Sequence, residues 1–257
     1  MWILILIVLA VVVYFVMSQA SSSNQSSKAS SRTKASKASS QNYTNQVDYS
    51  NLEVSLESDV LGQDYTHLRD LLAEGKWKEA DKETGRMMLL VGMILMKRQI
   101  RDGEYKGSSR EDCLAITNFR FLPCKDLCTI DRLWLKYSNG RFGFSVQKRI
   151  VSEIGDDALS ILVSSEQFNN KSFEIGNTLE RRIGWYTPRD DKAYGRKIYN
   201  DLTFSIQAPY GHLPTANYCC EGSSLSRKNV SFETEEVFGY QNLEAILNRL
   251  LSCGISL

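Results

Sequence analysis

The sequence predicts an all-α protein with a single compact helical domain. Apolar residues recur at helical spacing between residues 122 and 150, and again near the C-terminus from Leu243 to Leu251. Strict alternation of apolar and polar residues, which is typical of half-buried strands, is scarce along the whole chain. The chain has 257 residues, of which 42% are hydrophobic, so it is long enough to bury one sizeable core.

Residues 1–17 predict a transmembrane anchor. They include no charged side chain, and Trp2, Tyr14 and Phe15 lie near the two ends, where aromatic rings favour a membrane interface. A helix of this length spans about 25 Å, which is at the short end of the range for a transmembrane helix. A cleaved signal peptide is the alternative, because residues 18–20 resemble a small-residue cleavage site. Signal peptides usually begin with basic residues, and none precedes this apolar run.

Residues 18–60 are predicted to be a disordered linker, because Ser dominates their first half and apolar residues are few there. No acidic residue precedes Asp48, whereas the linker contains four basic residues, Lys28, Arg32, Lys34 and Lys37. Basic residues mark the cytoplasmic side of a membrane helix, so the folded domain is expected on that side. The rest of the chain is nearly balanced in charge, which argues against a dedicated nucleic-acid binder.

The folded domain is predicted to occupy residues 61–257 and to begin with two helices. Asp64 can cap the first helix and Gly75 can end it. The apolar stripe of this helix is Tyr65, Leu68, Leu71 and Leu72. The second helix is predicted to run from Trp77 into the apolar segment 87–96, which is too short to span a bilayer. That segment is therefore expected to form a buried helix or the wall of a pocket.

The next two helices are predicted between residues 122 and 155. Pro123 can open the first of them, and Asn139 followed by Gly140 can end it. Ser145 can cap the second helix. The two phenylalanines of the intervening RFGFS string are expected to lie in the core.

The pattern is weaker after residue 155 and returns to helix only at the C-terminus. A short apolar run at residues 158–163 is followed by a polar stretch. Residues 179–204 are predicted to be mostly loop, because they contain Pro188, Gly195 and several charges. Residues 243–251 show helical spacing again, and their apolar face is expected to pack back on the core.

The six cysteines do not predict a metal site. Cys124 and Cys128 are four residues apart on a predicted helix, so both thiols can face the same way. No second paired Cys or His motif completes a set of four ligands. On the cytoplasmic side of a membrane the cysteines are expected to be reduced thiols, either buried or without a role.

The sequence contains none of the motifs that would indicate a common catalytic site. It has no Gly-rich phosphate loop, no HExxH and no GxSxG, and only two histidines are available for acid–base or metal chemistry. An enzyme that uses carboxylates alone is the alternative, but nothing in the sequence points to one, and binding is better supported than catalysis. The chain is therefore not expected to be an enzyme.

Four segments carry a resemblance to a known family. They are DYTHLRDLLAEGKWKEADKETGRMML from Asp64, LPCKDLCTIDRLWLKYSNGRFGFSVQKRI from Leu122, IGW from Ile183 and APYGHLP from Ala208. Together they are similar to the genomes-uncoupled family. The resemblance implies an all-helical domain of cupped-hand shape that binds protoporphyrin IX or magnesium protoporphyrin IX. It also implies an accessory protein that stimulates magnesium chelatase in chlorophyll synthesis, with the large porphyrin-carrying subunit of that enzyme as its partner. The host compartment would be a cyanobacterial cytoplasm or a plastid stroma.

A porphyrin requires apolar or aromatic side chains for its faces and Arg or Lys for its two propionate groups. The segment around Trp185 offers both kinds of side chain, from Arg181, Arg182, Ile183, Trp185, Tyr186 and Arg189. The resemblance implies that Trp185 contacts the ring and that Met87, Met88 and Phe204 belong to the same surface. Family members usually show Gly-Arg-Glu soon after the Met-Leu run, whereas this chain reads VGMILMKRQIRDGEY. The basic residue of that stretch is assigned to Arg101.

Two further alternatives follow from the sequence. His212 can be an axial ligand to the magnesium of a metalloporphyrin, or a turn histidine bonded to the backbone, and the second interpretation is favoured. The whole chain can be a porphyrin-binding accessory protein, or a membrane-tethered helical sensor that uses the same domain with a different partner.

Overall fold

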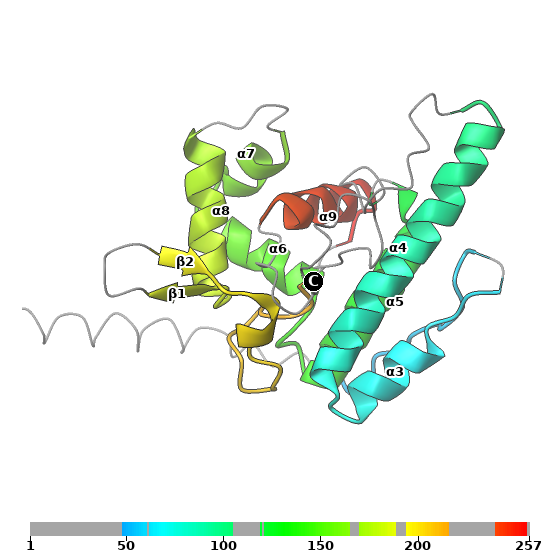
Figure 1. Ribbon diagram of the computed structural model, residues 1–257, viewed down its shortest axis with the longest axis horizontal. Coiled ribbons are helices and arrows are strands. Elements are labelled where there is room, and N and C mark those ends of the chain that lie inside the picture. The colour runs from blue at the N-terminus through cyan, green and yellow to red at the C-terminus, as the bar shows by residue number, and fades with distance from the viewer. Residues whose placement is uncertain are drawn as a thin grey trace, which may run out of the picture. The chain divides into compact units, whose positions relative to one another are not determined.

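The computed structural model describes residues 48–60, 62–104, 119, 121–164, 170–188, 194–215 and 240–255. Most of these residues are helical, which confirms the predicted all-α class (Figure 1). The helices are α3 (Thr66–Ala73), α4 (Trp77–Arg101), α5 (Cys124–Ser138), α6 (Phe144–Ser152), α7 (Ala158–Ser164), α8 (Asn170–Arg182) and α9 (Tyr240–Ser252). A small antiparallel sheet of β1 (Tyr186–Pro188) and β2 (Tyr194–Arg196), followed by the 3-10 turn η2 (Tyr199–Asp201), adds to them.

The helices form two groups that α9 connects. Helix α3 packs against α4 and α5, while α6, α7 and α8 pack against one another. Helix α9 contacts α5 as well as α6, α7 and α8, and lies between the two groups in Figure 1. Its buried face consists of Leu243, Ile246, Leu247 and Leu250. The C-terminal helix therefore packs back on the core, as its periodicity predicted.

The predicted helices in the first half of the domain are confirmed. The N-cap residue of α3 is Tyr65 and not Asp64 as predicted, although the Asp64 carboxylate accepts the backbone N–H of Thr66 at 2.8 Å. Gly75 follows the end of α3 with a φ of 69°. The second predicted helix is the single 25-residue helix α4. Asn139 ends α5 in the left-handed conformation, with a φ of 52°.

The start of α6 differs from the prediction. The helix begins at Phe144, so Ser145 lies inside it and is not its cap. The backbone N–H of Ser145 donates instead to the Asp131 carboxylate of α5, at 2.9 Å. Burial raises the pKa of Asp131, while hydrogen bonds from Ser145 and the backbone N–H of Phe144 oppose this shift. A side chain distant in sequence thus performs the capping, and local spacing cannot predict it.

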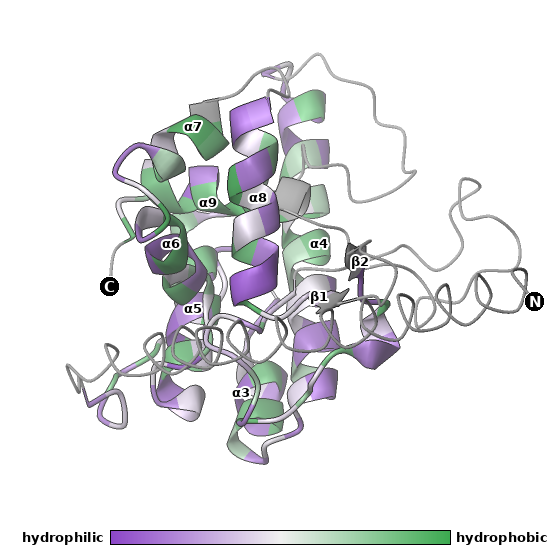
Figure 2. Cartoon of the chain, turned by 90° about the vertical axis from the view of Figure 1, so that its left-hand side faces the viewer, coloured by the Kyte–Doolittle hydropathy of each residue, from purple (hydrophilic) through white to green (hydrophobic). Residues whose placement is uncertain are grey.

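Helix α8 and the sheet were not predicted. Helix α8 is mostly polar and buries few apolar side chains, among them Ile175 and Leu179. Figure 2 shows hydrophilic and hydrophobic residues following one another along it, as in a helix with one face in the core. The segment predicted as loop contains the pairing of Tyr186 with Arg196 and of Pro188 with Tyr194. Strands of three residues are too short to show a periodic pattern in the sequence.

A cluster of aromatic rings holds α4 against α5. The rings of Trp77 and Trp134 are 6.1 Å apart, and Phe142 meets the two rings edge-on, at 5.5 and 6.2 Å. The indole N–H of Trp134 donates to the Thr84 hydroxyl at 3.0 Å, so its polar atom is satisfied inside the core. Phe142 and Phe144 are fully buried, which confirms their predicted place.

Residues 48–60 lie against α5 and are part of the domain. The buried Asp126 carboxylate accepts hydrogen bonds from the Tyr65 hydroxyl at 2.6 Å, from the Asp59 N–H at 3.1 Å and from the Ser58 hydroxyl. Val60 is buried as well. The predicted linker extended to residue 60, so its last part belongs to the folded unit that begins at Asp48.

Removing residues 48–60 is expected to destabilise the domain. A chain that starts at Leu61 loses two of the donors to Asp126, and a buried carboxylate without its donors is costly, at about 1–3 kcal/mol or more. We expect its urea midpoint, followed by circular dichroism, to fall clearly below that of a chain starting at Asp48. Equal midpoints for the two chains would show that this segment contributes no stability.

The predicted attachment to a membrane is corrected. Among the described residues, none of the helices is both long and apolar enough to cross a bilayer. Helix α4 is long, but charged residues flank its apolar segment 87–96 on both sides. Residues 1–17, to which the prediction of an anchor referred, lie outside the described residues. The anchored location on the cytoplasmic or stromal side is therefore not retained.

Candidate functional site

Two of the segments that carry the family resemblance meet at Trp185 and His212. The Trp185 side chain is only 1% exposed, and its indole N–H donates to the His212 carbonyl at 2.9 Å. The Nε2 atom of His212 accepts the Thr203 N–H at 3.1 Å, so Nδ1 carries the proton and donates to the Ile183 carbonyl at 2.6 Å. Burial lowers the pKa of His212 to about 4, which keeps the ring neutral at pH 7.

His212 is therefore the backbone-bonded turn histidine that the sequence favoured. Both of its ring nitrogens are engaged with backbone groups, and the residue itself is fully buried. Neither nitrogen has a lone pair directed at a ligand, so this arrangement excludes an axial contact to magnesium.

Two glycines are required for this close packing. Gly184 has a φ of 81°, and a Cβ atom there would lie 2.9 Å from the Pro209 side chain. Gly211 has a φ of 71°, and a Cβ atom there would lie 2.7 Å from the Ile150 side chain. A larger residue at either position would have an unfavourable backbone conformation and would clash with the neighbouring side chain. This explains the glycines of IGW and APYGHLP.

Helix α6 holds the same loop from the other side. The amide nitrogen of Gln147 donates to the carbonyls of Gly211 and Pro214, at 2.8 and 2.9 Å. The N–H of Gly143 donates to the Leu213 carbonyl at 3.0 Å. The string FGFSVQ, which is part of the resemblance, thus holds the loop of His212 through buried hydrogen bonds.

Helix α4 holds the end of the loop through Asp81. This buried carboxylate accepts the N–H and the hydroxyl of Thr215, both at 2.7 Å, and the Tyr199 hydroxyl at 2.9 Å. Burial raises the pKa of Asp81 to about 6, against the opposing effect of these hydrogen bonds. We call Asp81, Gln147, Trp185, His212 and Thr215 the junction. All four resembling segments contribute to the junction or contact it.

An exposed surface of cation and aromatic ring lies beside the junction at the end of α8. The Arg181 guanidinium is 5.8 Å from the centre of the Tyr186 ring, and the Tyr186 hydroxyl donates to Asn177 at 3.1 Å. Arg181 and Arg182 are exposed, while Tyr186 is partly so. The structure therefore brings Arg181 and Tyr186 together. Arg182, the last residue of α8, is exposed as well, and we call the three residues the α8 surface.

An ion pair fixes the hairpin that carries part of this surface. The buried Glu180 carboxylate is 3.0 Å from the Nε atom of Arg196 in β2. Because Glu180 is at the end of α8 and Arg196 pairs with Tyr186, the ion pair holds Tyr186 near the arginines.

A second cation lies over aromatic rings at the start of α4. The Lys78 ammonium is 5.7 Å from the Tyr199 ring and 5.6 Å from the Phe204 ring, and it donates to Asn200 at 2.6 Å. The two rings are 5.0 Å apart, and Phe204 is partly exposed. We call Lys78 and Phe204 the α4 surface. Sequence reasoning selected Phe204 but missed Lys78, for which local spacing gives no signal, because its partners follow 120 or more residues later.

The remaining predicted residues are not part of an exposed surface with these. Met87, Met88, Ile183 and Trp185 are all buried in the core. Arg101 is exposed at the far end of α4, about 34 Å along the helix axis from Lys78. Arg189 lies outside the described residues. A contact of the four buried side chains with a ring stays a prediction, and it would require movement of the segments that cover them.

The described residues offer no other site of obvious chemistry. Within them, no group of three Cys, His, Asp or Glu side chains is arranged to hold a metal ion. Cys124 is bonded to Cys253, so the expectation that these two are reduced thiols is wrong. An open cavity of about 520 Å³ is lined by His67, Leu71, Lys76, Glu79, Lys82, Glu83 and Arg86. Five of these seven lining residues are charged, and Arg86 pairs with Glu83 at 2.7 Å.

Comparison with known proteins gives consistent matches. The model of the GUN4-like family matches residues 56–233. The Ycf53-like protein of Synechocystis is 29% identical over 157 residues, which are 61% of this chain and 52% of that protein. The chloroplastic tetrapyrrole-binding protein of Arabidopsis thaliana is 27% identical over 151 residues, which are 58% of this chain and 47% of that protein. The chain thus matches about half the length of these relatives. The structure of GUN4 from Chlamydomonas reinhardtii superposes on 78% of this chain and 97% of its own, with 23% identity and a TM-score of 0.46.

Proposed function

Because the chain belongs to the GUN4-like family, we propose that it binds a tetrapyrrole and acts as a ligand carrier and regulator, not as an enzyme. The observation that carries this proposal is the family match over residues 56–233, together with the tetrapyrrole-binding relative from Arabidopsis thaliana. The proposed ligands are protoporphyrin IX and magnesium protoporphyrin IX, which the resemblance of the sequence also implies.

The exposed surfaces beside the junction have the chemistry that such a ligand requires. Arg181 and Arg182 can pair with propionate carboxylates, and Tyr186 offers an aromatic face next to them. Lys78 at the start of α4 and the neighbouring Phe204 offer the same combination of a cation and an aromatic ring. We assign ring contact to the α8 surface first, because two consecutive arginines are exposed there.

The proposed partner is the large porphyrin-carrying subunit of magnesium chelatase. A carrier that holds protoporphyrin by its propionate edge leaves the metal-binding centre of the ring open to an enzyme. The chain would thereby deliver substrate to the chelatase and stimulate chlorophyll synthesis. Faster magnesium insertion by purified chelatase subunits on addition of the chain would support this part of the proposal.

A titration of the chain with protoporphyrin IX tests the binding itself. We expect the visible absorbance of the porphyrin to shift and to saturate at one ring per chain, with quenching of tryptophan fluorescence. The same titration with magnesium protoporphyrin IX gives the preference between the two forms. An absorbance that follows that of free porphyrin at every ratio would contradict the proposal. The domain would then be better explained as a helical interaction module with a different partner.

A further inference from the structure

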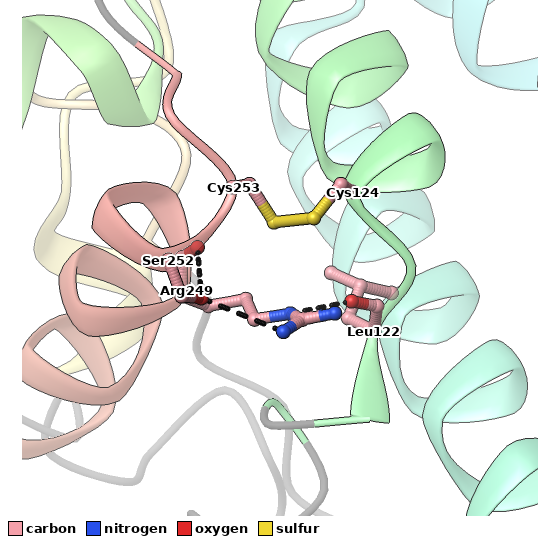
Figure 3. Close-up of a disulfide and its surroundings, with 5 residues drawn as sticks. All are labelled: Leu122, Cys124, Arg249, Ser252 and Cys253. Atoms are coloured by element: carbon pink, nitrogen blue, oxygen red, sulfur yellow. Dashed lines mark hydrogen bonds between the residues drawn. A yellow bond between two sulfur atoms is a disulfide. The ribbon is translucent and has the colours of Figure 1, made fainter.

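A disulfide joins the start of α5 to the end of α9. Cys124 is the first residue of α5, and Cys253 directly follows α9. Their Cα atoms are 5.3 Å apart, although 129 positions separate them in the sequence (Figure 3). The bond therefore links two helices that meet only in the folded domain.

The two sulfur-bearing residues differ in their access to solvent. Cys124 is exposed, because it occupies the first turn of α5, whereas Cys253 is half-buried beside the end of α9. Thiol–disulfide exchange requires a thiolate to reach one sulfur of the bond, and its rate depends on that access. Since Cys124 is the more exposed residue of the pair, we expect an incoming thiolate to attack its sulfur in the folded protein.

Noncovalent contacts hold the same two helix ends beside the disulfide. The Nε atom of Arg249 donates to the Leu122 carbonyl at 2.8 Å, as Figure 3 shows. The Lys148 ammonium of α6 donates to the Ile255 carbonyl at 2.7 Å, just beyond Cys253. The inner face of α9 is buried against the core. With these contacts in place, α9 can stay docked when the covalent bond is opened.

We propose that the Cys124–Cys253 disulfide is a thiol–disulfide exchange site, at which a dithiol reductant opens the link between α5 and α9 while the domain remains folded. The first thiolate of the reductant attacks the Cys124 sulfur, the bond to Cys253 breaks, and Cys253 leaves as a thiolate that takes up a proton. The second thiol of the reductant then attacks the reductant sulfur that is bonded to Cys124, and Cys124 is released as a thiol. The chain gains two electrons and two protons, and the reductant becomes a disulfide.

Opening the link is expected to lower the stability of the domain without unfolding it. A disulfide that closes a loop of this length strongly restricts the unfolded chain, so its loss lowers Tm by roughly 10 °C for a domain of this size. This inference concerns the covalent link alone and does not depend on tetrapyrrole binding.

The experiment uses the full chain in native buffer with dithiothreitol as the dithiol. Samples are quenched with acid at intervals and alkylated, and peptide mass spectrometry follows the peptides of Cys124 and Cys253. We expect both to become labelled within minutes, at a rate within about tenfold of that in urea, because access controls the rate. Far-UV circular dichroism should be unchanged over the same period, and the Tm should fall.

A pair of variants separates this site from the other thiols. Cys253→Ser should have the lower Tm of the reduced chain and no response of Tm to dithiothreitol. Cys128→Ser removes the free thiol one helical turn from Cys124 and should keep both the higher Tm and the response. If Cys253→Ser does not fold, the reduced wild-type chain provides the same comparison.

Three results would overturn the proposal. The first is full alkylation of Cys124 and Cys253 before any reductant is added, which would mean that the bond does not form. The second is labelling of both residues only after denaturant is added, which would make the bond inaccessible in the folded state. The third is rapid reduction with no change in Tm, which would show that the link does not secure α9.

Discussion

Replacing Trp185 with alanine is expected to destabilise the domain by about 3–5 kcal/mol, the usual cost of removing a large aromatic side chain from a core. Trp185 is among the largest fully buried side chains of the described residues, and it packs under the loop that contains His212. Urea unfolding followed by far-UV circular dichroism measures the loss. The resemblance of the sequence implied instead that Trp185 contacts the porphyrin ring.

Trp185→Phe is the matched control for this substitution. It keeps a buried aromatic ring but removes the indole N–H, which leaves the His212 carbonyl without that donor. An unsatisfied buried acceptor costs about 1–3 kcal/mol, so the loss should be smaller than for alanine. An alanine variant with the urea midpoint of the wild type would place Trp185 outside the core.

The junction is expected to contain two groups whose pH effects oppose each other. The pKa of His212 is lowered to about 4 in the folded state. Its contribution to the free energy of unfolding is therefore present above pH 6.5 and is lost as the pH falls towards 4. The pKa of Asp81 is raised to about 6 in the folded state. Its contribution to the free energy of unfolding is therefore present below pH 3.8 and is lost as the pH rises through 6. At 1.36 kcal/mol per pKa unit, each effect is about 3 kcal/mol.

Asp81→Asn should make this opposition visible. The variant keeps an oxygen that can accept the Thr215 N–H, and its amide can donate to the hydroxyls of Thr215 and Tyr199. Between pH 7 and pH 4 the wild-type chain gains the Asp81 contribution, and the variant does not. The unfolding free energy of the variant relative to wild type should therefore fall by about 2.5 kcal/mol over this range.

Urea unfolding of both proteins at half-unit pH steps checks this expectation. The other carboxylates titrate equally in the two proteins, so they cancel in the difference. Parallel pH profiles for wild type and Asp81→Asn would contradict the raised pKa of Asp81.

Local pattern was sufficient to predict several helices of the domain. The stripe beginning at Tyr65, the run into the segment 87–96 and the spacing near the C-terminus each place apolar side chains on one helix face. Asn139 ended its helix as expected, because a short polar residue tolerates the left-handed conformation. These features depend on neighbours within one or two turns.

Features that depend on distant residues could not be predicted. The start of α6 is capped by Asp131, and Cys124 pairs with a residue 129 positions away, so no spacing in the sequence indicates either contact. Helix α8 was missed because few of its residues are apolar. Residues 48–60 were predicted as linker because their anchoring contacts are to Asp126 in a later helix.

The predicted binding site shows the same distinction. Arg181, Arg182 and Tyr186 are close in sequence. The structure places the Arg181 guanidinium beside the Tyr186 ring and leaves Arg182 exposed. Trp185 is between them and points the other way, because its indole N–H is used by the loop of His212. The sequence can identify a segment rich in aromatic and basic residues. Which of its side chains face inward depends on the buried hydrogen bonds of the junction, which join residues far apart in the sequence.

The dissociation constants of protoporphyrin IX for two double variants test most directly whether the α8 surface binds the propionates. Arg181→Gln with Arg182→Gln should weaken binding about tenfold or more, because charge-assisted hydrogen bonds to carboxylates are lost. Arg98→Gln with Arg101→Gln removes the same charge from the far end of α4, where both arginines pair with Asp102, and should leave the constant unchanged. Equal affinities for the first variant and wild type, or a larger loss for the second variant, would show that the propionates do not bind at the α8 surface.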